Sequence, residues 1–151
     1  MSTAEPSAQI ASARPEMTAT IMAETGLDEG ILRDLVRSFY DKVRRDEVLG
    51  PIFAARITYW GPHLERMVAF WSSVALMTGR YHGRPVQAHT PLPIKRDHFE
   101  LWLVLFRETA HEVCTAEGAA HVIERAERIA RSLHIAVEEA HAAPDAIPAL
   151  R

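Results

Sequence analysis

One long internal segment of this chain, residues 79–98, cannot form a regular helix. It reads GRYHGRPVQAHTPLPIKRDH, and its helix-breaking residues are Gly79, Gly83, Pro85, Pro91 and Pro93. Proline lacks a backbone donor and glycine leaves the backbone unrestricted, so this density of both interrupts helical hydrogen bonding. Loops longer than roughly 12 residues are uncommon inside compact domains, and those that occur are usually functional or disordered. Three of the eight histidines lie here, at positions 82, 89 and 98, so we expect the loop to carry function.

The segments on both sides of this loop have helical periodicity. Apolar residues recur at spacings of three and four over residues 28–45, 61–77, 97–116 and 119–141, and a short helical turn is expected over 46–53. No segment alternates between apolar and polar residues over a useful length. We therefore predict an all-α fold with four main helices, in which Gly118 separates the third helix from the fourth.

The chain length of 151 residues fits one domain with its own core. Residues 1–24 are rich in Ala, Ser, Thr and Pro and lack aromatic residues, which indicates a flexible N-terminal tail. We predict that the domain spans residues 25–142 and that residues 143–151 form a C-terminal tail.

Charge and cysteine content exclude several classes of function. The net charge of -3 leaves no basic surplus for phosphates, so we expect no nucleic acid as partner. Cys114 is the only cysteine, which excludes an intrachain disulfide and a thiolate cluster. No signal peptide is recognisable, and no window approaches ~18 consecutive apolar residues. We expect a cytoplasmic protein that makes no membrane contact and binds a small partner.

Three large residues with polar tips fall on the predicted apolar faces: Tyr40, His63 and Trp102. A buried hydroxyl, imidazole or indole N–H needs a hydrogen-bond partner, and each of these residues alone is more often a satisfied core residue. Together they indicate one cavity whose ligand accepts hydrogen bonds. No phosphate-binding loop, H-E-x-x-H motif or nucleophile elbow is present, and Glu-x-x-His occurs twice, at Glu108–His111 and at Glu138–His141. A metal site, a haem pocket and a plain helical bundle all remain open at this point.

Four strings carry a resemblance to a known family. SFYDKVRRDEVLGPIF, WGPHLERMVAFW, GRYHGRPVQAHTPLPI and HFELWLVLF, in this order and spacing, resemble the group III truncated haemoglobins over about residues 27–140. This resemblance implies a two-over-two helical sandwich, with the helix pairs B/E and G/H around haem b (iron protoporphyrin IX). The loop 79–98 would be the linker and short F region, with His89 as the metal ligand.

The resemblance also implies roles for other residues. Tyr40 and Trp102 would direct hydrogen-bond donors at an iron-bound ligand, and His63 would be the distal histidine; these three are the candidate catalytic residues. Further cofactor contacts are expected from Phe39, Phe53, Arg66, Met67, Trp71, Arg80, Tyr81 and Arg84. Arg66 is placed for a haem propionate. His98 is the rival to His89 as iron ligand, because it lies nine residues further on, at the start of the third helix.

The implied function is a haem protein with an iron capable of pentacoordination and a polar distal pocket. Its small ligands would be O₂, NO, CO or peroxide, and a separate reductase would supply electrons. Two donors should slow O₂ release, which favours NO detoxification or a peroxidase-like activity over O₂ transport. The alternatives are an O₂ or NO sensor or scavenging module without turnover, and a helical domain that binds no haem.

Overall fold

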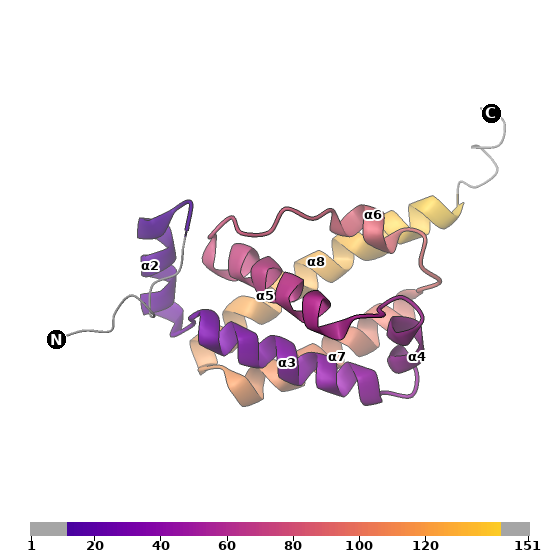
Figure 1. Cartoon of the computed structure of the whole chain (residues 1–151), viewed down its shortest axis with the longest axis horizontal. Helices are drawn as coiled ribbons and strands as arrows, with labels where there is room; N and C mark the ends of the chain where they lie inside the picture. Colours follow the sequence, from indigo (N-terminus) through magenta and orange to yellow (C-terminus); the bar gives the residue numbers. More distant parts are fainter. Residues whose placement is uncertain (1–11, 143–151) are drawn as a thin grey trace, which may run out of the picture.

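The computed structural model describes residues 12–142, and every regular element in this range is a helix (Figure 1). The predicted C-terminal tail, residues 143–151, lies outside the described residues. The helices are α2 (Pro15–Thr25), α3 (Glu29–Arg45), α4 (Leu49–Ala54), α5 (Trp60–Leu76), α6 (Pro85–His89), α7 (Arg96–Val113) and α8 (Ala116–Ala142). None of these helices is long and apolar enough to cross a membrane.

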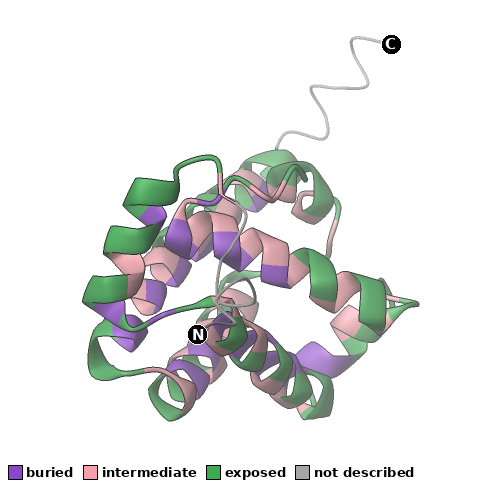
Figure 2. Cartoon of the chain, turned by 60° about the vertical axis from the view of Figure 1, so that its left-hand side comes forward, coloured by how far each residue is buried: buried purple, intermediate pink, exposed green. Residues whose placement is uncertain are grey.

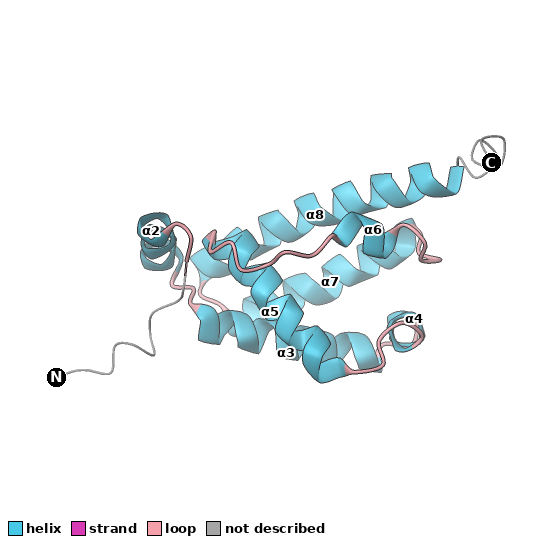
Figure 3. Ribbon diagram, turned by 45° about the horizontal axis from the view of Figure 1, so that its top comes forward, coloured by secondary structure: helices cyan, strands magenta, loops and turns pink. Residues whose placement is uncertain are grey.

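The four long helices form two pairs. Helix α3 packs on α5, and α7 packs on α8, while α3 also contacts α7 and joins the two pairs. Figure 3 shows α7 and α8 side by side, with α5 crossing α3 in the other layer. Helices α4 and α6 are short connectors, and α6 lies against α8. This arrangement confirms the predicted all-α, two-over-two fold, in which α3/α5 and α7/α8 correspond to the B/E and G/H pairs.

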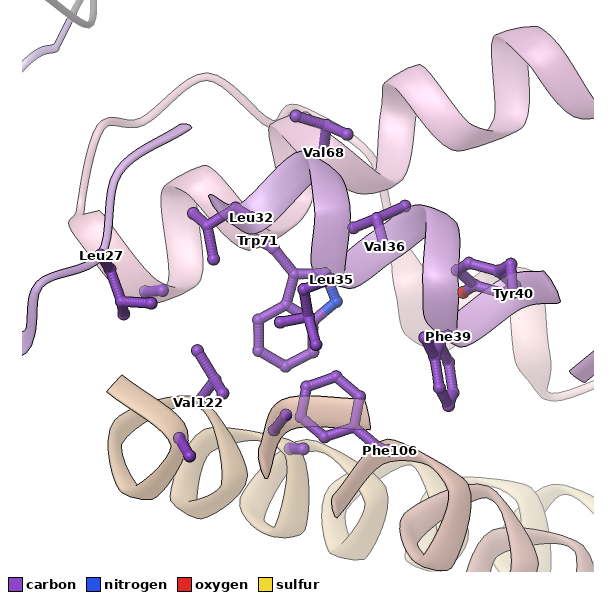
Figure 4. Packing of buried hydrophobic residues seen from close by; sticks show 14 of the residues in the cluster. Leu27, Leu32, Leu35, Val36, Phe39, Tyr40, Val68, Trp71, Phe106 and Val122 are labelled. Carbon is purple, nitrogen blue, oxygen red and sulfur yellow. The ribbon is translucent and has the colours of Figure 1, made fainter. Parts of the chain in front are cut away.

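The core lies between the two pairs and is built from aromatic and branched side chains (Figure 4). The rings of Trp71 on α5 and Phe106 on α7 stack with centroids 4.9 Å apart, and Phe39 on α3 meets Phe106 edge-on at 5.3 Å. Figure 2 shows the buried residues on the inward faces of the helices and the exposed ones outside. The periodicity of α3 predicts this directly, since its buried residues are Leu32, Leu35, Val36, Phe39, Tyr40 and Val43.

The predicted tail over residues 1–24 is wrong for its second half, because Pro15–Thr25 form helix α2. Proline at the first helical position suits a helix start, and Gly26, with a φ of 73°, ends it in the left-handed conformation. The Thr18 hydroxyl donates to the Leu76 carbonyl at the end of α5, over 2.7 Å. Helix α2 also contacts α8, so tertiary contacts stabilise a segment whose own periodicity is weak. Residues 1–11 lie outside the described residues.

The loop 79–98 contains one short helix, α6, which begins at Pro85 and ends at His89.

The predicted break between the last two helices, at Gly118, is displaced by three residues. The break lies at Cys114–Thr115, and Gly118 is buried inside α8. A Cβ atom at Gly118 would lie 3.0 Å from the Thr25 carbonyl oxygen. Glycine therefore allows α8 to approach the end of α2 closely.

Candidate functional site

A cavity of about 430 Å³ lies between the helix pairs and is closed on one side by α6 and the residues after it. Cavities of this size are typical of small-molecule and cofactor sites. Its walls are mostly apolar and come from α3, α4, α5, α7 and α8. Tyr40, His63, Met67, Trp71 and Trp102, predicted from the sequence, all line it.

The polar residues of the cavity are packed by aromatic contacts. The Tyr40 ring lies 5.3 Å from the His63 ring at 84° and 5.0 Å from the Phe39 ring. Trp102 meets Phe39 edge-on at 5.2 Å and stacks on Phe106 at 5.5 Å. These contacts position the side chains of Tyr40, His63 and Trp102 before any ligand binds.

Burial shifts the acid–base properties of two of these residues. Desolvation raises the pKa of Tyr40, which is 6% exposed, so its hydroxyl stays protonated at physiological pH and remains a donor. Burial, and then the charges of Arg66 and His89, lower the pKa of His63 to about 4, so this imidazole is neutral. The Nε2 atom of His63 is buried and has no hydrogen-bond partner among the described residues. His63 lines the cavity, so this nitrogen is available for a hydrogen bond to a ligand there.

The two histidines that compete for the metal have opposite tautomers. His89 Nδ1 lies 2.6 Å from the Pro85 carbonyl oxygen, which can only accept, so Nδ1 carries the proton and Nε2 keeps a lone pair. His98 Nδ1 instead accepts a hydrogen bond from the Lys95 N–H, over 2.9 Å. The neutral His98 ring is therefore protonated at Nε2. Both rings line the cavity, whereas His82 is exposed and does not.

The remaining predicted contacts divide into two groups. Phe53, Arg66 and Tyr81 line the cavity, in addition to the residues already named. Phe39, Arg80 and Arg84 do not. Phe39 is 1% exposed and packs behind Tyr40 and Trp102, and Arg80 forms an ion pair with Glu29. Arg84 is exposed at the residue before α6.

Sequence reasoning assigned no site role to several lining residues. Among them are Arg56, Phe70, Phe99, Ile129 and Leu133. Ile129 and Leu133 are four residues apart on α8, and Phe70 lies on the apolar face of α5, so periodicity places all three in the interior. Periodicity alone does not distinguish a core position from a cavity wall.

The donor set of the cavity fits haem better than an isolated metal ion. Among residues 12–142 no three His, Cys, Asp or Glu side chains are grouped so that they could hold a metal. Haem brings its own equatorial nitrogens, so the protein needs only an axial imidazole and an apolar slot. The cavity offers both, since it is lined by imidazoles, those of His63, His89 and His98, and by aromatic side chains.

The comparisons with known proteins agree with this geometry. The family model of bacterial-like globins matches residues 20–137. The chain belongs to this globin family. The group 3 truncated hemoglobin of Campylobacter jejuni is 38% identical to this globin over 112 residues, which are 71% of this globin and 87% of the relative. The resemblance to group III truncated haemoglobins is thereby confirmed, and the chain is a haem-binding globin.

Two solved structures are similar to this globin. The crystal structure of the group III truncated hemoglobin from Campylobacter jejuni aligns with a TM-score of 0.70 at 34% identity, covering 74% of this globin and 91% of that chain. A thermostable hemoglobin from the actinobacterium Thermobifida fusca aligns with a TM-score of 0.60 at 24% identity, covering 70% and 89%. At that identity the second likeness supports the fold alone.

Proposed function

We propose that the cavity binds haem b and that His89 is the axial ligand of the iron. The tautomer of His89 carries this proposal, because the Pro85 carbonyl holds the proton on Nδ1 and leaves the Nε2 lone pair for a metal. His98 presents a protonated Nε2, which has no lone pair in the imidazole plane to donate. The chemistry of the donor atom therefore favours His89.

We propose Tyr40, His63 and Trp102 as the distal residues. A haem held by one imidazole offers an open axial position where a small ligand such as O₂, NO or CO can bind. The Tyr40 hydroxyl and the Trp102 indole N–H are donors, and the neutral His63 ring can donate from one nitrogen and accept at the other. Each donor stabilises a ligand that carries partial negative charge by roughly 1.5–3 kcal/mol.

Arg66 is the proposed partner of a haem propionate, because it is the α5 cation that lines the cavity. The other two arginines predicted for this role are placed differently. Arg80 is engaged by Glu29, and Arg84 lies outside the lining. The Tyr81 side chain lines the cavity near the start of the linker and is a proposed wall contact.

The polar pocket favours chemistry on the bound ligand over O₂ transport, because two donors oppose ligand release. We propose NO detoxification, with the net reaction NO + O₂ + e⁻ → NO₃⁻, and a peroxidase-like reaction with peroxide as the second candidate chemistry. The electron comes from a separate reductase. The single cysteine, whose pKa burial raises to about 11, suits a reducing cytoplasm and takes no part in the reaction.

Stopped-flow mixing tests this function. Ferrous protein equilibrated with O₂ is mixed with NO, and nitrate is measured with wild type and with Tyr40→Phe. We expect nitrate to form much faster than with free haem and more slowly in the variant. Nitrate formation at the rate of free haem would instead indicate a sensor or scavenging module without turnover. If the protein purified after expression with added haem had no Soret band, both NO detoxification and a haem-based sensor or scavenging function would be excluded.

A further inference from the structure

The first turn of α5 carries His63, yet its backbone is weakly held. The residue before the helix, Tyr59, makes no capping hydrogen bond through its side chain. The first backbone bond of the turn, from His63 N–H to the Tyr59 carbonyl, is 3.4 Å long, whereas about 2.9–3.0 Å is usual. No atom lies within 4 Å of the place where Gly61 would carry a Cβ. Backbone contacts therefore do little to position His63, and side-chain contacts must do so.

The side chain of Trp60 contacts His63 and the residues around it. The Trp60 ring lies 5.6 Å from the His63 ring at 87°, and 5.9 Å from the Tyr40 ring. The guanidinium carbon of Arg44 lies over the Trp60 ring, 4.4 Å from its centroid, which is cation–π geometry. Tyr40 and His63 line the cavity, whereas Trp60 does not. Trp60 therefore packs behind these two polar side chains.

Arg44 is itself fixed at the end of α3. A Cβ atom at Gly50 would lie 2.8 Å from the Arg44 carbonyl oxygen, so α4 packs directly on this part of the backbone. The Arg44 side chain makes no ion pair with a described residue, whereas its neighbour Arg45 pairs with Asp41 over 2.9 Å. The Arg44 guanidinium contacts Trp60 instead of a carboxylate.

We propose that Arg44 is a positioning residue of the distal pocket: by stacking on Trp60 it holds the first turn of α5 and keeps the His63 imidazole inside the cavity beside Tyr40. This inference rests on the proposed function, because it describes how the distal side of that haem pocket is ordered. Arg44 is not among the residues that line the cavity, so it would act through Trp60 and His63.

Loss of the Arg44 contact shifts His63 toward solvent. The charged and titratable groups that face His63 are Tyr40 on α3, Arg66 on α5 and His89 on α6. Solvation removes the largest cause of the low pKa of His63, which is burial. An exposed cation–π contact is worth about a two- to fivefold change in an equilibrium, so the population of His63 outside the cavity should rise by about that factor.

NMR titration of His63 tests the contact directly, in the CO-bound haem protein with Arg44→Ala, Arg44→Lys and Arg45→Ala. Arg45→Ala removes the same charge from the same turn and controls for long-range electrostatics. We expect Arg44→Ala to raise the pKa of His63 by about half a unit over the control, and Arg44→Lys to restore part of the wild-type value. Equal values for Arg44→Ala and Arg45→Ala would overturn the proposal.

CO association measured by flash photolysis gives a second readout. Because His63 fills part of the cavity, its displacement should raise the association rate about two- to fivefold in Arg44→Ala. In a His63→Ala background the same substitution should have no effect, and an effect of equal size there would contradict a role through His63. If the protein bound no haem, the proposed function would fail, while the titration repeated on that haem-free protein would still decide whether Arg44 positions His63.

Discussion

At the residue scale, Tyr40 and Trp102 are the proposed donors to a bound ligand, and ligand retention should depend on them. Tyr40→Phe and Trp102→Phe each remove one charge-assisted hydrogen bond, so O₂ dissociation should become faster by about tenfold or more. The measurement is O₂ release from the ferrous protein by stopped flow. Tyr59→Phe is the matched control, because Tyr59 is 74% exposed and lies outside the cavity lining. Unchanged dissociation rates in both pocket variants would refute the donor roles.

His63 predicts a pH dependence of stability. Its folded pKa, about 4, lies below the ordinary value of 6.5, so the unfolded chain binds more protons between these pH values. The contribution of His63 is fully present above pH 6.5, falls as pH drops to about 4 and is constant below that. Urea unfolding of wild type and His63→Gln should show the wild type losing stability relative to the variant across this window. A difference that does not change with pH would contradict the neutral, buried state of His63.

The identity of these residues could be predicted because each polar tip falls on an apolar helical face, where it needs a partner. Their neighbours could not be predicted with the same certainty. Phe39 shares the face of Tyr40 but packs behind it, and the side chain of Arg80 turns to Glu29. Such choices depend on helix crossing and on ion pairs between distant residues, which leave no local pattern in the sequence.

At the scale of elements, the junction of α3 and α4 depends on Gly50. A Cβ atom there would meet the Arg44 carbonyl at 2.8 Å, so Gly50→Ala forces the backbone to shift and should destabilise the protein by roughly 1–3 kcal/mol. Gly61→Ala is the matched control, since nothing lies within 4 Å of its Cβ position, and it should be neutral or stabilise by about 0.4–1 kcal/mol. Chemical denaturation measures both. Equal effects would show that the close contact does not limit this junction.

Helix α2 should contribute to stability through one buried hydrogen bond. Thr18→Val removes the bond to the Leu76 carbonyl and leaves that acceptor unpaired, at a cost of about 1–3 kcal/mol. Thr20→Val is the control, because Thr20 is exposed and, within residues 12–142, its hydroxyl bonds only to the Glu16 carbonyl of its own helix. Thermal unfolding should separate the two variants by several degrees. If they unfold alike, α2 does not depend on its contact with α5.

The sequence did not reveal α2 because its pattern is weak and its composition is that of a tail. The contacts that stabilise it, from Thr18 to Leu76 and from Thr115 to the Thr25 carbonyl, join residues 58 and 90 positions apart. The longer helices could be predicted because each carries its own apolar face. Sequence periodicity is sufficient to predict a helix where the apolar pattern is strong. It fails where contacts with distant residues stabilise the helix.

At the scale of the whole molecule, two helix pairs and a linker enclose the cavity lined by Tyr40, His63 and Trp102. The order of the long helices and the position of the linker between α5 and α7 follow from periodicity and from helix-breaking residues. The cavity could not be predicted in this way, because it arises where side chains from six helices leave space between them. The family resemblance implied His89 as the metal ligand, and the tautomers of His89 and His98 give a physical reason to propose it.

The central claim is that this cavity holds haem through His89. The most direct measurement is the resonance Raman spectrum of the ferrous protein, which reports the iron–histidine bond, for wild type, His89→Ala and His98→Asn. Asn at position 98 keeps an acceptor for the Lys95 N–H but has no imidazole. We predict that the iron–histidine band is present in wild type and His98→Asn and lost in His89→Ala. Loss of the band in His98→Asn, with the band retained in His89→Ala, would contradict the assignment.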